Sequence, residues 1–184
     1  MAIYRPEFEA ALRLLARMSE EMAAQGYSRP VLVGGAAVEY YSQSAIGTGD
    51  FDLCTPWQQA FEAIMRGHGF IRPSGPGKAT RGWIHPKLAL GFEVVASVPM
   101  DGSVDREHIL LLDDFSEEGS LAIISVEDLI ADRMGQYASG SAAGMLGQAR
   151  ALLRLHPDAD MHYLERRIRE ETDGEHGVED IAND

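Results

Sequence analysis

Apolar residues near the start of the chain recur with a helical period. Phe8, Leu12 and Leu15 are spaced three or four residues apart, and charged residues lie between them. Residues with this spacing share one side of a helix, so the pattern predicts an amphipathic helix. Gly26 follows and is expected to end it.

Short apolar runs then alternate with further helical segments. The runs that we expect to form strands are 30–33, 51–54, 88–97, 108–113 and 121–125, with helical segments at 36–43 and 57–69. Beyond these runs the pattern is helical only, over 125–138, 142–156 and 159–171. The order predicts an α+β fold of mixed α/β character, in which helices flank a small mixed sheet and a helical segment follows.

Composition supports a single globular core without a membrane partner. The chain has 184 residues, of which 45% are apolar, and its one cysteine, Cys54, rules out an intramolecular disulfide. The segment 1–21 contains acidic residues and no long apolar run, so we expect neither a signal peptide nor a membrane span. A cytoplasmic location fits these features.

Acidic residues dominate the charge, and they are unevenly distributed. The formal net charge is −13, which argues against extended nucleic-acid binding because such binding depends on neutralising phosphates. The last fifteen residues hold seven acids and neither Lys nor Arg. We therefore predict a core over 1–124, a helical segment packed on it over 125–172, and a disordered, solvated tail over 173–184.

Two aspartates lie one residue apart in an otherwise apolar run. In a strand, Asp50 and Asp52 point to one face while Phe51 and Leu53 point to the other. Two carboxylates this close repel each other unless a cation lies between them, and oxygen ligands suit Mg²⁺ or Mn²⁺. The alternative is a pair of solvated acids at the end of a surface strand, or an Asx turn.

A pair of glycines joins the first expected strand to a helical segment. Gly34 and Gly35 allow the backbone to approach a ligand closely, and the start of the helix offers unpaired N–H groups to an anion. Taken alone, the pair also fits a tight turn. The order of strand, two glycines, helix and D-x-D strand instead favours a phosphate site beside a metal site.

These motifs resemble the signature of the nucleotidyltransferase-fold (DNA polymerase β-like) superfamily. The signature reads "VGG", fourteen residues, then "DFDL", and Thr48 matches a threonine often found before the first aspartate. "GHGF" and "SVEDLIADRM" resemble features of small bacterial members, including relatives of toxin components of toxin–antitoxin systems. The resemblance covers roughly residues 28–155.

The resemblance implies a third carboxylate on a later strand. Glu93 is the only acid in "LALGFEVVAS" and is expected to join Asp50 and Asp52 as a catalytic residue and metal ligand, or to act as a general base. The alternative for Glu93 is a solvated position on an edge strand. Asp113 is the next candidate for the third carboxylate.

The resemblance also suggests residues that bind the nucleotide. We expect Gly34, Gly35 and Thr48 to contact it, joined by Arg133 of the "EDLIADR" segment and by Lys78 of a glycine-rich loop. Arg133 alternatively pairs with a neighbouring acid, and the loop around Lys78 is alternatively a linker.

An active nucleotidyltransferase is the first functional hypothesis. It would transfer a nucleoside monophosphate from a nucleoside triphosphate to a hydroxyl of a small molecule, a protein or an RNA end, with Mg²⁺ or Mn²⁺. A second is a nucleotide-binding module without turnover, because Ile46 stands where small members often carry Arg and Glu93 where Asp is usual. A third is a structural subunit whose helices bind a protein partner or a second copy of the chain.

Overall fold

The chain divides into two compact units. The computed structural model describes residues 3–73 and 82–182. The first unit comprises residues 1–123 and contains the strands, while the second comprises residues 124–184 and is helical. None of the helices in the described part of the chain is both long and apolar enough to cross a membrane.

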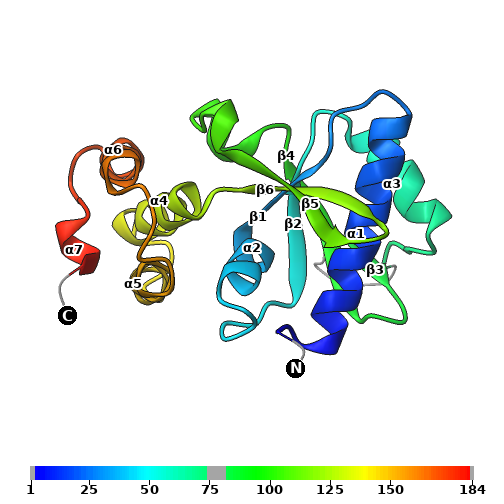
Figure 1. The fold of residues 1–184 in the computed structure, drawn as a ribbon, viewed down its shortest axis with the longest axis horizontal. Coiled ribbons are helices and arrows are strands. Elements are labelled where there is room, and N and C mark those ends of the chain that lie inside the picture. Colours follow the sequence, from blue (N-terminus) through cyan, green and yellow to red (C-terminus); the bar gives the residue numbers. More distant parts are fainter. Residues whose placement is uncertain (1–2, 74–81, 183–184) are drawn as a thin grey trace. The chain divides into compact units, whose positions relative to one another are not determined.

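A mixed six-stranded sheet forms the first unit, in the order β3-β4-β2-β1-β6-β5 (Figure 1). The strands are β1 Val31–Val33, β2 Asp50–Cys54, β3 Trp83–His85, β4 Leu90–Ala96, β5 Ile109–Ser116 and β6 Gly119–Ile124. Strand β2 is antiparallel to β1 and parallel to β4. Strand β1 also runs parallel to β6, and β3 pairs antiparallel with β4. The D-x-D strand therefore lies inside the sheet, with a neighbour on each side.

One face of this sheet is buried by aromatic packing. The helices that pack against each other here are α1 (Pro6–Ala24) and α3 (Gln58–Gly67) (Figure 1). The Phe8 ring of α1 lies 5.2 Å from the Phe51 ring, which stacks on Phe92 at 4.6 Å. Phe70, just after α3, meets Phe92 edge-on at 4.8 Å. This apolar face holds β2 and β4 in fixed register, which positions the residues on their opposite face.

The helix α2 (Gly34–Tyr41) follows β1 without an intervening loop. A loop from Ser42 to Gly49 then returns the chain to β2. Two 3₁₀ turns, η1 (Pro99–Gly102) and η2 (Arg106–His108), connect β4 to β5.

Beyond Ile124, the last residue of β6, the regular elements of the described second unit are all helices. They are α4 (Val126–Ala138), α5 (Met145–Leu155), α6 (Met161–Glu171) and α7 (Glu179–Ala182). Helix α4 packs against α5 and α6, and α5 contacts α7. Side-chain caps start two of them: Ser125 Oγ accepts from the backbone N–H of Asp128, and Asp160 caps α6 in the same way.

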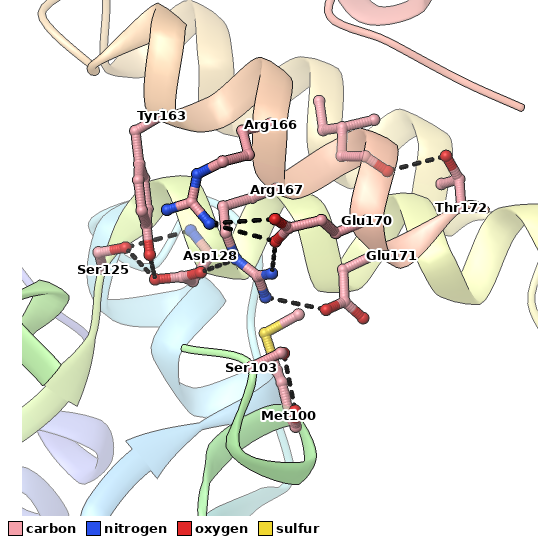
Figure 2. Close-up of polar contacts among 11 residues, drawn as sticks. Met100, Ser103, Ser125, Asp128, Tyr163, Arg166, Arg167, Glu170, Glu171 and Thr172 are labelled. Carbon is pink, nitrogen blue, oxygen red and sulfur yellow. Dashed lines mark hydrogen bonds and ion pairs between the residues drawn. The ribbon is translucent and has the colours of Figure 1, made fainter. Parts of the chain in front are cut away.

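A buried ion pair ties α4 to α6 (Figure 2). Asp128 and Arg167 are fully buried, and Arg167 Nε donates to Asp128 Oδ1 at 2.6 Å. The Tyr163 hydroxyl and the Ser125 hydroxyl both donate to Asp128 Oδ2 at 2.9 Å. The guanidinium of Arg167 also reaches Glu170 and Glu171. Asp128 of the "EDL" motif thus joins α4 to α6.

The predicted fold class is confirmed, since a mixed sheet with flanking helices precedes a run of helices. Two short elements, β3 and α7, were not among the expected ones. The acidic composition of 173–184 predicts a solvated tail, whereas the structure places α7 there with Ile181 only 4% exposed. Glu165 accepts a hydrogen bond from the Val178 N–H, and Arg169 pairs with Glu179, so local polar contacts hold this segment.

Candidate active site

Two adjacent strands carry the three candidate carboxylates on one face of the sheet. In the parallel register of β2 and β4, Asp52 lies opposite Glu93 and Asp50 lies opposite Gly91. Neighbouring strands are about 4.8 Å apart, so the backbones of Asp52 and Glu93 are close neighbours. Asp50 is exposed, while Asp52 and Glu93 are partly exposed. The backbone therefore brings all three predicted positions together.

The apolar alternation of β2 places these carboxylates away from the core. Phe51, Leu53 and Phe92 have no exposed surface and point to the opposite face. A one-residue slip of β2 against β4 would bury the aspartates and expose the aromatic rings. The packing of that apolar face is therefore the physical reason for the register of the acids.

Gly34 allows Asp52 to lie against the start of α2. Because Asp52 pairs with Val33 on β1, the next residue along the chain is beside the aspartate side chain. Gly34 has a φ of +62°, and a Cβ at this position would be 2.2 Å from Asp52 Oδ2. Any side chain would clash there, besides being strained by the left-handed backbone. Glycine is thus required for the contact between the D-x-D strand and the helix start.

Gly35 likewise allows the Thr48 side chain to lie against the start of α2. A Cβ on Gly35 would be 2.6 Å from Thr48 Oγ1, and that hydroxyl donates to the Asp50 carbonyl oxygen at 3.1 Å. The two glycines therefore face two residues of the predicted site. This close contact accounts for both glycines within the protein itself, independently of any ligand.

A buried glutamate that sequence reasoning missed holds the loop before β2. Glu39, on α2, is fully buried, and its Oε1 accepts from Arg5 Nε at 2.6 Å and from Ser44 Oγ at 2.9 Å. Its Oε2 accepts from Arg5 Nη2 at 3.0 Å and from the Thr48 N–H at 2.6 Å. The available signal was a single acid inside the apolar helical segment 36–43, since such an acid needs a partner when buried.

Electrostatics favour the charged form of this pair. Burial alone would raise the pKa of Glu39, but hydrogen bonds from Arg5, the Thr48 N–H and Ser44 outweigh it and lower that pKa below its ordinary value. The hydrogen bond to Glu39 correspondingly raises the pKa of Arg5. The loop before β2 is therefore built around an ionised carboxylate and a guanidinium.

A hollow opens beside Glu93, with a volume of about 510 Å³. Its lining combines acidic, amide and apolar side chains: Gln58, Glu62, Trp83, Glu93, Val94 and Val95. Glu62 accepts from Arg72 Nη2 and from Gln58 Nε2, both at 2.9 Å. The hollow is large enough for a small organic group next to the third carboxylate.

The donor set of the site is suited to a hard divalent cation. Carboxylates are the oxygen ligands that Mg²⁺ and Mn²⁺ prefer, and Asp50, Asp52 and Glu93 provide them on one face. Within residues 3–73 and 82–182, however, no three His, Cys, Asp or Glu side chains converge closely enough to hold a metal ion. The strand register thus places the three residues side by side, while their side chains do not converge on one point. Asp113 lies on β5, separated from β2 by β1 and β6.

A solved structure has a similar fold. The crystal structure of an antigenic nucleotidyltransferase-like protein from Paracoccidioides brasiliensis matches with a TM-score of 0.61 at 14% sequence identity. The match covers 94% of this chain and 90% of that chain. The fold is nucleotidyltransferase-like. No protein-family model and no curated protein matches the chain.

Of the two predicted cationic nucleotide ligands, one belongs to the second unit and the other lies outside the described residues. Arg133 belongs to α4 of the second unit, and its side chain is only 7% exposed. Its Nη2 lies 3.2 Å from Asp132 Oδ2, and its Nη1 lies 3.3 Å from Met145 Sδ. Lys78 lies outside the described residues. Within the nucleotidyltransferase-like fold, the first unit alone carries Gly34, Gly35, Thr48 and the three carboxylates.

Proposed function

We propose that the protein is a metal-dependent nucleotidyltransferase. It transfers a nucleoside monophosphate from a nucleoside triphosphate to a hydroxyl of an acceptor. The observation that carries this proposal is the register that places Glu93 opposite Asp52 and on the face of Asp50, next to the helix start at Gly34. The nucleotidyltransferase-like fold supports the same reaction class.

Each group has a separate chemical role in this proposal. The start of α2 at Gly34 and Gly35 contributes unpaired N–H groups and the positive end of the helix dipole, which favour the phosphates. Asp50 and Asp52 would hold Mg²⁺ or Mn²⁺, with Glu93 as a third ligand. A bound divalent cation would supply neutralisation of phosphate charge in this site.

Glu93 is the residue proposed to act on the acceptor. Its carboxylate is on a different strand from the D-x-D pair and beside the hollow, so it can accept the proton of a hydroxyl placed there. The oxygen of that hydroxyl then attacks the α-phosphorus, and pyrophosphate leaves from the opposite side. Holding the two reactants in line is the main contribution of such a site.

Thr48, Arg133 and Lys78 remain proposed contacts of the nucleotide. Thr48 orders the start of β2, and a guanidinium or ammonium group such as that of Arg133 or Lys78 is chemically suited to a triphosphate. We propose a cytoplasmic enzyme whose acceptor is a small molecule, a protein or an RNA end. The net charge of −13 disfavours an extended nucleic acid. A toxin-like role would follow if the acceptor proves to be a cellular protein or RNA.

Transfer of radiolabel from α-labelled nucleoside triphosphates into cell extract tests the function. With Mg²⁺, the wild-type protein should label an acceptor and release pyrophosphate. Asp52→Asn should abolish labelling, and Glu93→Gln should slow it by about 10²-fold, the scale of a lost general base. Asp113→Asn, an exposed acid on the same sheet, is the matched control and should retain the wild-type rate. Equal rates for wild type and Glu93→Gln would remove Glu93 from the mechanism.

A nucleotide-binding module without turnover is the second candidate. It is favoured by the absence, within the described residues, of three acidic side chains converged on one point. It also agrees with Ile46 and Glu93, which depart from the family pattern. Binding of a triphosphate with Mg²⁺ but no pyrophosphate release in any extract would support this candidate over the enzyme.

A further inference from the structure

Glu39 and Arg5 together hydrogen-bond the backbone N–H and the backbone carbonyl of Thr48, in the loop before the D-x-D strand. Glu39 Oε2 accepts from the Thr48 N–H at 2.6 Å, and Arg5 Nη2 donates to the Thr48 carbonyl oxygen. Arg5 and Glu39 are themselves joined by two hydrogen bonds. The backbone of Thr48 is thus fixed on its donor side and on its acceptor side by a single ion pair.

Thr48 lies two residues before Asp50, the first of the candidate metal ligands. Thr48 Oγ1 donates to the Asp50 carbonyl oxygen. The position of Thr48 therefore constrains the backbone of Asp50, the first residue of β2. Ser44 Oγ donates to Glu39 Oε1 and accepts from the Arg5 N–H at 3.1 Å, which anchors the middle of the same loop. The ion pair therefore determines where the chain enters the D-x-D strand.

Burying the Glu39 carboxylate costs desolvation free energy, although Arg5 remains partly exposed. Hydrogen bonds from Arg5, the Thr48 N–H and Ser44 offset this cost. Apolar residues of similar size would often stabilise a fold as well as a buried ion pair does. Groups behind a metal ligand, in contrast, strongly affect metal affinity by orienting the ligands.

We propose that Glu39, acting with Arg5, is a positioning residue for the binding of a divalent cation and triphosphate by Asp50 and Asp52. Neither residue touches the substrate in this proposal. Their role is to hold the Thr48–Asp50 segment so that the two carboxylates present a fixed pair of ligands. The inference rests on the proposed function, because it assumes that this face binds a metal and a triphosphate.

The test measures Mn²⁺ affinity by electron paramagnetic resonance, in the presence of a triphosphate analogue with a non-hydrolysable α,β linkage. Glu39→Gln removes the charge but keeps the side-chain size. Because Glu39 reaches Asp50 only through Thr48, the substitution should weaken Mn²⁺ binding by several-fold, up to about 10-fold, the lower end of the effect of a group that bonds a metal ligand directly. Arg5→Lys keeps the charge but loses the planar fork, and it should weaken binding in the same direction. If Glu39→Gln fails to fold, Arg5→Lys still tests the proposal, because the Arg5 side chain is 34% exposed and its replacement should disturb the fold less.

The matched control is Asp128→Asn, which disturbs the buried ion pair of the second unit. It lowers stability without touching the loop before β2, so Mn²⁺ affinity per folded molecule should remain at the wild-type value. Hydrogen exchange gives a second readout that needs no ligand. The Thr48 amide should exchange faster in Glu39→Gln than in wild type, whereas amides of α1 and α3 should not change.

The outcomes separate the inference from the proposed function. Wild-type Mn²⁺ affinity in both Glu39→Gln and Arg5→Lys would overturn the positioning role and leave the proposed function standing. No Mn²⁺ binding by the wild-type protein would overturn the proposed function and the inference with it. Equal weakening in Asp128→Asn would show a general loss of stability and would overturn the positioning role.

Discussion

Two buried carboxylates, Glu39 in the first unit and Asp128 in the second, are each held by an arginine and by hydroxyl groups. Asp128 joins regular elements, because Arg167 and Tyr163 both come from α6. Glu39 instead holds an irregular loop, through Ser44 and the Thr48 N–H. The same chemistry thus fixes a helix pair in one unit and shapes the approach to a candidate site in the other.

Exposure of the arginine is the main physical difference between the two pairs. Arg167 has no exposed side-chain surface, whereas the Arg5 side chain is 34% exposed. Water can partly replace the partner of an exposed guanidinium, but it cannot reach a fully buried one. Removing the arginine should therefore be more costly in the second unit than in the first.

The largest effect is expected from Arg167→Met. It leaves Asp128 buried without its guanidinium partner, so we expect a loss of about 3–5 kcal/mol in the free energy of unfolding. Urea unfolding monitored by circular dichroism measures it. Arg166→Met, on the same helix but 43% exposed, is the control and should cost below about 1 kcal/mol. Similar losses for the two variants would contradict the structural role of the buried pair.

A smaller effect is expected from Arg5→Met. Because solvent reaches Arg5, we expect a loss of about 1–2 kcal/mol, measured by the same urea unfolding. Arg13→Met, which removes an exposed i,i+4 pair with Glu9 on α1, should cost clearly less than Arg5→Met. A loss for Arg5→Met as large as that for Arg167→Met would show that the two pairs do not differ in this way.

Tyr163→Phe should cost about 1 kcal/mol, because it removes one hydrogen bond to Asp128 while keeping the ring in place. Arg167 and Ser125 still satisfy the carboxylate in this variant. Thermal unfolding of the variant beside wild type measures the difference. A loss comparable to that of Arg167→Met would mean that the tyrosine, not the arginine, is the main partner of Asp128.

The smallest effect is expected from pH. The pKa of Glu39 in the folded protein lies below its ordinary value of 4.5, so the unfolded chain takes up a proton first as pH falls. The stabilisation from Glu39 is therefore present above the unfolded pKa and is lost as pH falls through the folded pKa. Glu39→Gln should show a shallower loss of stability than wild type between neutral pH and about pH 3. Parallel pH profiles would contradict this contribution.

Local patterns predicted the D-x-D strand well. The i, i+2 spacing places Asp50 and Asp52 on one face, and the apolar residues between them fix which face is buried. Local patterns could not predict the position of Glu93 opposite Asp52, because it depends on the register between two strands that are far apart in the sequence. That register is set by the packing of Phe51 on Phe92, which no local pattern contains.

Long-range partners are what the sequence could not provide. Glu39 and Arg5 are 34 residues apart, so an acid in an apolar helix indicated a need for a partner without identifying it. Asp128 was assigned to a motif, and its partner Arg167 is 39 residues away. The strand β3 has only three residues, too few to show an alternating pattern. The charged composition around α7 concealed the single buried Ile181.

In the proposed function, Asp50 and Asp52 bind a divalent cation together with a nucleoside triphosphate. The most direct test is the melting temperature with and without Mg²⁺ and the triphosphate, for wild type and for Asp50→Asn combined with Asp52→Asn. A ligand that binds only the folded state raises its stability, so wild type should melt at a higher temperature with both ligands present. The double variant should show no such rise. An equal rise in the double variant would contradict the site.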